Sequence, residues 1–176
     1  MITTKYYHEK LLIGNAYEED IANMLMKHIG FDIGLFTNVN DQYNIGESKR
    51  GIEIKNDEKI QEHLNIYIEY AEKSNAKNKR FVPSGILRED NTNFILIGNH
   101  DIAFLLNKSK LLEYINEYPD IYSKKKIGTS RGYVISLNEV GKMPEDVRCW
   151  TFAFNHKFLR LMMQNVPPST ISCVTL

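Results

Sequence analysis

The segment Gly46–Ser74, with the sequence GESKRGIEIKNDEKIQEHLNIYIEYAEKS, decides how we expect this chain to fold. It holds two runs in which apolar and polar side chains alternate, Gly51–Lys55 and Asn65–Ala71, joined by a polar stretch. Alternation with a period of two is typical of β-strands, because successive side chains of a strand point to opposite faces. The segment therefore predicts two strands, each with one apolar face.

Each run carries an acidic residue, Glu53 in the first and Glu69 in the second. The same alternation places Glu53, Lys55 and Asp57 on one face of the first strand. If the two strands pair as neighbours, Glu53, Glu69 and at least one lysine gather on a single patch. Crowded carboxylates repel one another, so such a patch usually needs a cation. A hard divalent metal ion with oxygen ligands fits that requirement.

The composition bounds the class of protein. The chain has 176 residues, enough for one domain with a full hydrophobic core. Hydrophobic residues make up 43% and charged residues 25%, which is typical of a folded domain and not of a disordered chain. The formal net charge is zero, so no whole-molecule field attracts nucleic acid, and any such binding requires a local basic patch.

Compartment signals favour the cytoplasm. No apolar run approaches the length of a membrane span, so we expect no membrane partner. The start of the chain, MITTKYYHEK, lacks the basic-then-apolar pattern of a secretory signal. The two cysteines, Cys149 and Cys173, form no metal-ligand pair and are interpreted as incidental thiols in a reducing compartment.

The order of elements predicts an α/β fold in which a mixed sheet is flanked by helices. Helices are expected where apolar residues recur every three or four positions: Asn15–Ile29, Asp101–Tyr114 and Thr151–Met163. Further strands are expected at Phe31–Phe36, Asn93–Gly98 and Arg131–Leu137. Loops or turns are expected at Thr37–Arg50, with a short strand near Tyr43–Ile45, and at Ser74–Arg80, Phe81–Leu87, Ser123–Ser130 and Asn138–Gly141. The tail Pro167–Leu176 is expected to form an extended strand or a docked arm.

The stretches NAYEEDIANML, GF-x-I and IEIK together resemble the PD-(D/E)xK nuclease superfamily. Its signature is an acid, a variable gap, and then acid-x-Lys on the neighbouring strand. Asp41, eleven intervening residues, Glu53, Ile54 and Lys55 match this pattern. The stretches GIEIKND, NIYIEY and PSGI are also similar to small phage-type members of the superfamily. The likeness covers roughly residues 14–100, about half of the chain.

The resemblance implies a restriction-endonuclease-like fold over residues 1–176, with a core at about 14–137 and a C-terminal helix and tail at 150–176. It implies Mg²⁺-dependent hydrolysis of DNA phosphodiester bonds, with Mn²⁺ able to substitute for Mg²⁺. The catalytic residues it implies are Glu18, Asp41, Glu53, Lys55 and Glu69. Among these, Asp41, Glu53 and Glu69 would be the metal ligands. Nucleases of this kind often pair two active sites, so the resemblance also implies a homodimer.

Two alternatives for the first acid stay open, because Asp41 lies in a loop-like segment and no proline precedes it. Glu47 can take its place. In a shifted register, Glu53 or Asp57 is the first acid and Glu69 the second, with Lys73 or Lys55 as the lysine. Acid-x-Lys on a strand is also common as a solvated face with a cross-strand ion pair.

Basic residues on two segments are candidates for binding nucleic acid. They are Lys73, Lys77, Lys79, Arg80, Lys124, Lys125 and Lys126. A run of lysines is more often a solvated loop, but together these residues can line a phosphate track. A rival to the nuclease is a nuclease-like module that has lost its chemistry and binds DNA or a protein partner.

Overall fold

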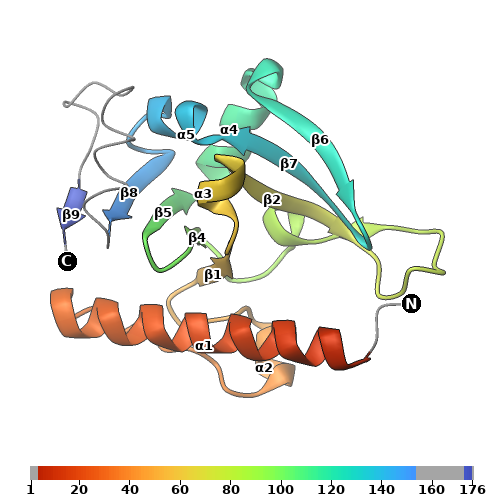
Figure 1. Ribbon diagram of the computed structural model, residues 1–176, viewed down its shortest axis with the longest axis horizontal. Coiled ribbons are helices and arrows are strands. Elements are labelled where there is room, and N and C mark those ends of the chain that lie inside the picture. Colours follow the sequence, from red (N-terminus) through yellow and green to blue (C-terminus); the bar gives the residue numbers. More distant parts are fainter. Residues whose placement is uncertain (1–3, 154–172, 176) are drawn as a thin grey trace.

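The computed structural model describes residues 4–153 and 173–175 (Figure 1). Its helices are α1 (Thr4–Ile29), α2 (Val39–Asn44), α3 (Ile60–His63), α4 (Lys108–Glu117) and α5 (Leu137–Lys142), with 3₁₀ turns η1 (Gly85–Leu87) and η2 (Pro119–Ile121). Its strands are β1 (Ile52–Asn56), β2 (Asn65–Glu72), β3 (Val82–Pro83), β4 (Phe94–Gly98), β5 (Ile102–Asn107), β6 (Tyr122–Ile127), β7 (Ser130–Ser136), β8 (Arg148–Ala153) and β9 (Cys173–Thr175). The chain is therefore a mixed α/β protein with two sheets.

The first sheet has the order β1-β4-β5-β8-β9, with parallel pairs at both of its edges and antiparallel pairs between them. Helix α1 lies across one face of this sheet (Figure 1). Its side chains Tyr17, Ile21 and Leu25, spaced four residues apart, are buried against Ile52 and Ile54 of β1. This packing places the apolar side of β1 against the helix and leaves the opposite side of β1 for polar groups.

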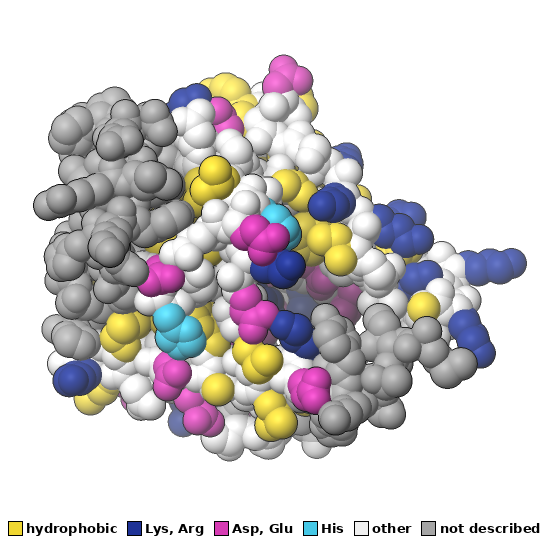
Figure 2. Space-filling view, viewed as in Figure 1, with side chains coloured by type: hydrophobic (Ala, Val, Ile, Leu, Met, Phe, Trp, Pro, Cys, Tyr) yellow, Lys and Arg dark blue, Asp and Glu magenta, His cyan; other side chains and the backbone are white. Residues whose placement is uncertain are grey.

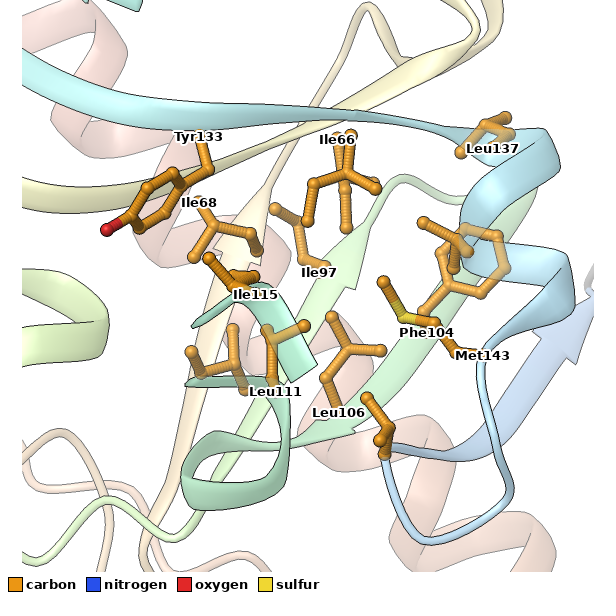
Figure 3. Packing of buried hydrophobic residues seen from close by; sticks show 14 of the residues in the cluster. Ile66, Ile68, Ile97, Phe104, Leu106, Leu111, Ile115, Tyr133, Leu137 and Met143 are labelled. Carbon is orange, nitrogen blue, oxygen red and sulfur yellow. The ribbon is translucent and has the colours of Figure 1, made fainter. Parts of the chain in front are cut away.

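The second sheet is antiparallel, with the order β3-β2-β7-β6. A core of buried residues lies between it, the other face of the first sheet, and α4 (Figure 3). Ile66 and Ile68 of β2 meet Ile97 of β4 and Leu111 of α4 in this core. The two sheets are thus held together by apolar side chains from both.

Four of the strands expected from the sequence are confirmed, as is the end of the first helix. The strands are β1, β2, β4 and β7. Gly30 ends α1 with φ of +67°, and its N–H donates to the Met26 carbonyl at 3.0 Å. The bond from Gly30 to Met26 is that of an αL C-cap, and the Phe31 N–H donates to the Leu25 carbonyl at 3.3 Å. The helix begins earlier than expected, at Thr4.

The two alternating runs, β1 and β2, do not pair with each other, so the expectation that they are neighbouring strands is wrong. β1 pairs in parallel with β4, whereas β2 pairs with β3 and β7 in the other sheet. The short helix α3 and Leu64, which has φ of 51°, lie between them and redirect the chain. β4 is apolar and buried almost throughout, so it can lie at the centre of the fold beside β1. Its Ile95 and Ile97 side chains belong to the core between the sheets, and Leu96 belongs to the core under α1.

The helix expected at Asp101–Tyr114 is a strand followed by a helix. The Asn99 side chain accepts from the N–H groups of Asp101 and Ile102, which forms a turn between β4 and β5. The run after it is buried on both faces of the sheet. Its continuous apolar pattern does not distinguish a buried strand from a buried helix. Asn107 then caps α4, since its side chain accepts from the Lys110 N–H.

Other differences arise at polar segments and near the C-terminus. Phe31–Phe36 contributes only a single bridge, Leu35 to Ser48, and the segment expected as a loop contains α2. The segment Ser123–Ser130 lies largely in strand β6, and Asn138–Gly141 lies in α5, capped by Ser136. Residues 151–153 of the expected C-terminal helix form part of β8, and the rest of that helix lies outside the described residues. The tail prediction is confirmed for β9, which pairs with β8, and residues 167–172 lie outside the described residues.

A tight turn at residues 48–52 feeds the chain into β1. The Ser48 hydroxyl accepts from the Ile52 N–H at 2.9 Å and donates to the Ile52 carbonyl at 2.8 Å. Gly51 has φ of +68°, and a Cβ there would lie 2.4 Å from the Asn91 carbonyl oxygen. Only glycine fits this turn without displacing the backbone that leads into β1.

We expect Gly51→Ala to lower the free energy of unfolding by more than the roughly 1–2 kcal/mol that a left-handed backbone costs a residue with a Cβ. The matched control is Gly14→Ala in α1, where a Cβ would meet nothing within 4 Å. That change should stabilise the protein by about 0.5–1 kcal/mol because alanine favours a helix. Urea denaturation measures both, and equal effects of the two substitutions would contradict the turn geometry.

Candidate functional site

Lys55 on β1 lies between two carboxylates. Its Nζ atom is 2.6 Å from Glu47 Oε1 and 2.8 Å from Glu53 Oε1. Glu53 and Lys55 share the face of β1 that points away from α1, as the alternation of the strand predicts. Desolvation alone would lower the pKa of Lys55, but the Glu53 and Glu47 carboxylates raise it above the ordinary value of a lysine. The lysine is therefore held in its charged form.

Glu47 reaches Lys55 from the segment that precedes the turn into β1. Its Oε2 atom accepts from the Ile54 N–H at 3.1 Å, and its backbone carbonyl accepts from the Phe36 N–H at 3.0 Å. Burial raises the pKa of Glu47, the Lys55 ammonium opposes this shift, and Glu53 adds to it. The carboxylate is thus held by the Ile54 N–H and the Lys55 ammonium, and the charge of a second carboxylate acts on it.

Glu18 supplies a third carboxylate, from α1. Its pKa is raised from 4.5 to about 7, first by burial and then by the negative charge of Glu47, with Lys55 opposing the shift and Glu53 adding to it. Glu18 therefore interacts electrostatically with the Glu47–Lys55–Glu53 cluster. The three carboxylates can carry more negative charge than one ammonium group balances, and a cation would relieve their repulsion.

A cleft of about 610 Å³ opens beside this cluster, between the two sheets. Glu53 and Lys55 line it from the first sheet, and Tyr67, Glu69 and Lys125 line it from the second. Figure 2 shows a hollow near the middle of this face with acidic and basic side chains around it. The cleft offers both signs of charge on facing walls.

Glu69 enters the cleft from β2, not from a strand beside β1. The Ser84 hydroxyl donates to Glu69 Oε1 at 2.5 Å, and Ser84 is itself buried. Gly85, with φ of +51°, lets η1 pass close to β2, because a Cβ there would lie 2.3 Å from the Glu69 carbonyl oxygen. The PSGI stretch therefore holds Glu69 in place.

Asp41 makes its described contacts elsewhere. It lies in the first turn of α2, where its Oδ2 atom accepts from Asn38 Nδ2 at 2.5 Å and its N–H donates to Asn38 Oδ1 at 2.8 Å. It is not among the residues that line the cleft. Of the two acids before β1 considered as the first acid, Asp41 and Glu47, only Glu47 has a described ion pair with Lys55. Asp57 also lines the cleft, and burial raises its pKa.

The basic candidates divide between two surfaces. Lys125 lines the cleft, whereas Lys124 and Lys126 lie over the Tyr133 and Phe81 rings on the other side of β6. Lys73 also lies near the Phe81 ring. The remaining candidates are exposed in the segment after β2: Lys77, Lys79 and Arg80.

The sequence alone did not reveal two residues at the cleft. Lys10 lines it and pairs with Glu58 at 2.5 Å, but the first thirteen residues carried no pattern that linked them to the site. Ser84 was visible only as part of a turn. Its contact with Glu69 spans fifteen positions, and no local pattern announces it.

The donor set tests whether a metal ion fits. Within residues 4–153 and 173–175, no group of three or more Asp, Glu, His or Cys side chains already has the arrangement of a metal site. The available donors, Glu18, Glu47 and Glu53, are all carboxylates, which suit Mg²⁺ or Mn²⁺ better than a soft metal. Their uncompensated charge fits a divalent cation.

Comparison of the chain with protein family models, with characterised proteins and with solved structures found no match. In the described part of the chain, no helix combines the length and the apolar character that a bilayer crossing requires.

The raised pKa of Glu18 predicts a pH-dependent stability. The folded protein holds this proton more tightly than the unfolded chain does. The contribution of Glu18 to the free energy of unfolding therefore falls as the pH rises from about 4.5 to about 7 and is constant above that range. Glu18→Gln removes this loss, so its stability relative to the native chain should increase through the same range. Thermal unfolding across that range measures the difference. Glu19→Gln, at the exposed neighbour, is the control, and a pH-independent difference for Glu18→Gln would contradict the prediction.

Proposed function

We propose that this protein is a Mg²⁺-dependent nuclease with a restriction-endonuclease-like fold that hydrolyses phosphodiester bonds of DNA. The observation that carries the proposal is the Lys55 ammonium group held between Glu47 and Glu53 at the edge of the cleft. An acid, a gap, and then acid-x-Lys is the pattern that the resemblance implied, with Glu47 in place of Asp41 as the first acid.

Glu47, Glu53 and Glu18 would hold the metal ion, which when bound supplies a Lewis acid and lowers the pKa of coordinated water. Lys55 is held charged, so its part is to stabilise negative charge on a phosphoryl oxygen and not to remove a proton. Glu18 has a pKa of about 7 without a metal ion, so near neutral pH it would bind the ion in competition with a proton. Glu69 faces the same space from the second sheet, fixed by Ser84.

Cleavage of supercoiled plasmid and linear duplex DNA with Mg²⁺ tests the proposal. We expect Glu53→Gln, Glu47→Gln and Lys55→Ala each to lower the rate by about 10²-fold or more, since each removes a group that binds or stabilises charge at the reacting phosphate. Asp41→Asn is the matched control and should stay within a few-fold of the native rate.

Full activity in both Glu53→Gln and Lys55→Ala would discard the proposed site. Loss of activity in Asp41→Asn, with Glu47→Gln active, would assign the first acid to Asp41 instead. The homodimer stays a prediction.

The nuclease-like binding module is favoured by one specific observation. Lys55 already satisfies both Glu47 and Glu53, so these three side chains can serve as a structural ion-pair network without a metal. In that case Mg²⁺ would not bind at this site and would not stabilise the folded protein through it.

A metal titration separates the two functions. For the nuclease, Mg²⁺ or Mn²⁺ should raise the melting temperature, with about 2.7 kcal/mol of stabilisation at a hundred times the dissociation constant. The Glu47→Gln/Glu53→Gln double variant should lose this stabilisation. Glu113→Gln, at an exposed acid paired with Lys110 on α4, should keep it. Equal metal responses in all three proteins would favour the binding module.

A further inference from the structure

Three cations surround one aromatic ring at the end of the second sheet. The Arg131 guanidinium carbon lies 3.9 Å from the centroid of the Phe81 ring, and the Nζ atoms of Lys73 and Lys126 lie 5.2 Å and 5.9 Å from it. Lys124 Nζ lies 6.0 Å from the centroid of the Tyr133 ring on the same side of the sheet. We name these residues the basic hairpin surface: Lys73, Phe81, Lys124, Lys126 and Arg131.

Strand β6 carries this charge to both of its faces. Lys124 and Lys126 pair in register with Tyr133 and Arg131, and so face the same side as the Phe81 ring. Lys125, between them, points to the other side and lines the cleft. In Figure 2 Lys and Arg side chains gather on the side of the molecule where β6 ends and β7 begins in Figure 1. The basic hairpin surface is therefore continuous around an edge strand with the wall of the cleft.

These cations have no carboxylate partner among the described residues. Within the described part of the chain, no Asp or Glu oxygen lies within ion-pair distance of Lys73, Lys124, Lys126 or Arg131. Lys73 instead donates to the backbone carbonyls of residues 76 and 78. Clustered like charges repel one another, so a partner that brings negative charge would stabilise the cluster.

A purely structural role explains only part of the cluster. β6 is the outer strand of its sheet, and lysines on such a strand prevent pairing with the edge of another molecule. That role accounts for Lys124, Lys125 and Lys126. It does not account for the placement of Lys73 and Arg131 around the Phe81 ring.

The geometry favours phosphate groups over bases. The Phe81 ring is covered by Arg131, and Tyr133 is only 8% exposed between Tyr70 and Tyr122, so these rings offer no free face for stacking. The charged groups themselves are outermost. A guanidinium group stacked on an aromatic ring keeps its donors in a fixed fork, which matches the oxygens of a phosphate.

We propose that the basic hairpin surface binds the phosphate backbone of duplex DNA outside the cleft. β6 is the outer strand of its sheet, so its cations would meet the phosphate groups of a duplex that lies along this edge. The choice of DNA as the partner rests on the proposed function. The contacts carry no base readout, so the binding is independent of sequence.

Fluorescence anisotropy of a labelled duplex, with EDTA present to prevent cleavage, tests the proposal. The Lys126→Gln/Arg131→Gln double variant should flatten the slope of log K against log salt by about 1.8 between about 50 and 200 mM salt, and weaken binding at 0.1 M by about 60-fold. The matched control is Lys110→Gln/Lys142→Gln, which changes the net charge equally at exposed lysines of α4 and α5. It should leave both quantities close to native.

Unchanged affinity and slope in the first double variant would overturn the proposal and leave edge protection as the role of the β6 lysines. Lys126→Arg, which keeps the charge, should bind as the native chain does, and its failure to bind would also count against a phosphate contact. Thermal unfolding confirms that each variant is folded. A polyglutamate peptide that binds more tightly than DNA of equal charge would replace DNA with an acidic protein partner.

The two proposals fail separately. Binding is measured without a divalent ion, so a protein that binds DNA through this surface but never cleaves it would retain this inference and lose the nuclease. If the protein cleaves DNA but both double variants bind the duplex as tightly as the native chain does, the nuclease proposal stands and this inference fails.

Discussion

The ion pairs of Lys55 with Glu47 and Glu53 are the interaction on which the rest of the site depends. They join the segment before the turn into β1 to the strand itself, so one wall of the cleft is set by a single ammonium group. Glu53 is only 7% exposed, and a carboxylate so shielded from water requires a partner. Burial raises the pKa of Glu18 to about 7, and the Glu47 and Glu53 carboxylates add to this shift while the Lys55 ammonium opposes it. The backbone geometry of the segment that leads into β1 therefore sets the positions of the charges at the cleft.

Each of the two sheets forms one wall of the cleft. The first sheet, with α1 behind it, supplies the acidic cluster, and the second sheet supplies Glu69 and the lysines of β6. Apolar residues from both sheets form the core that holds these walls at their separation (Figure 3). Although the formal net charge is zero, the charges are segregated: acids gather at β1, and cations gather on the basic hairpin surface. A local field of this kind can attract a phosphate backbone that the whole molecule does not.

Patterns within a few residues predicted the elements that they govern. The alternation in β1 and β2, the apolar run of β4 and the glycine at the end of α1 all gave elements of the right type. The run before α4 was misassigned because a fully buried strand shows no period. The three lysines of β6 were expected in a loop, since hydropathy does not show that pairing with β7 can hold a polar strand. Each error occurred where partners distant in sequence decided the local conformation.

The sequence by itself determined that Glu53 and Lys55 share one face of a strand, because side chains of a strand alternate whatever surrounds it. It also determined that α1 would carry acids beside an apolar stripe. Only the tertiary structure decided that Glu47, and not Asp41, pairs with Lys55, and that Glu69 reaches the cleft from a different sheet. Those placements depend on which apolar faces are buried against one another over long sequence separations, and burial of that kind leaves no local pattern in the chain.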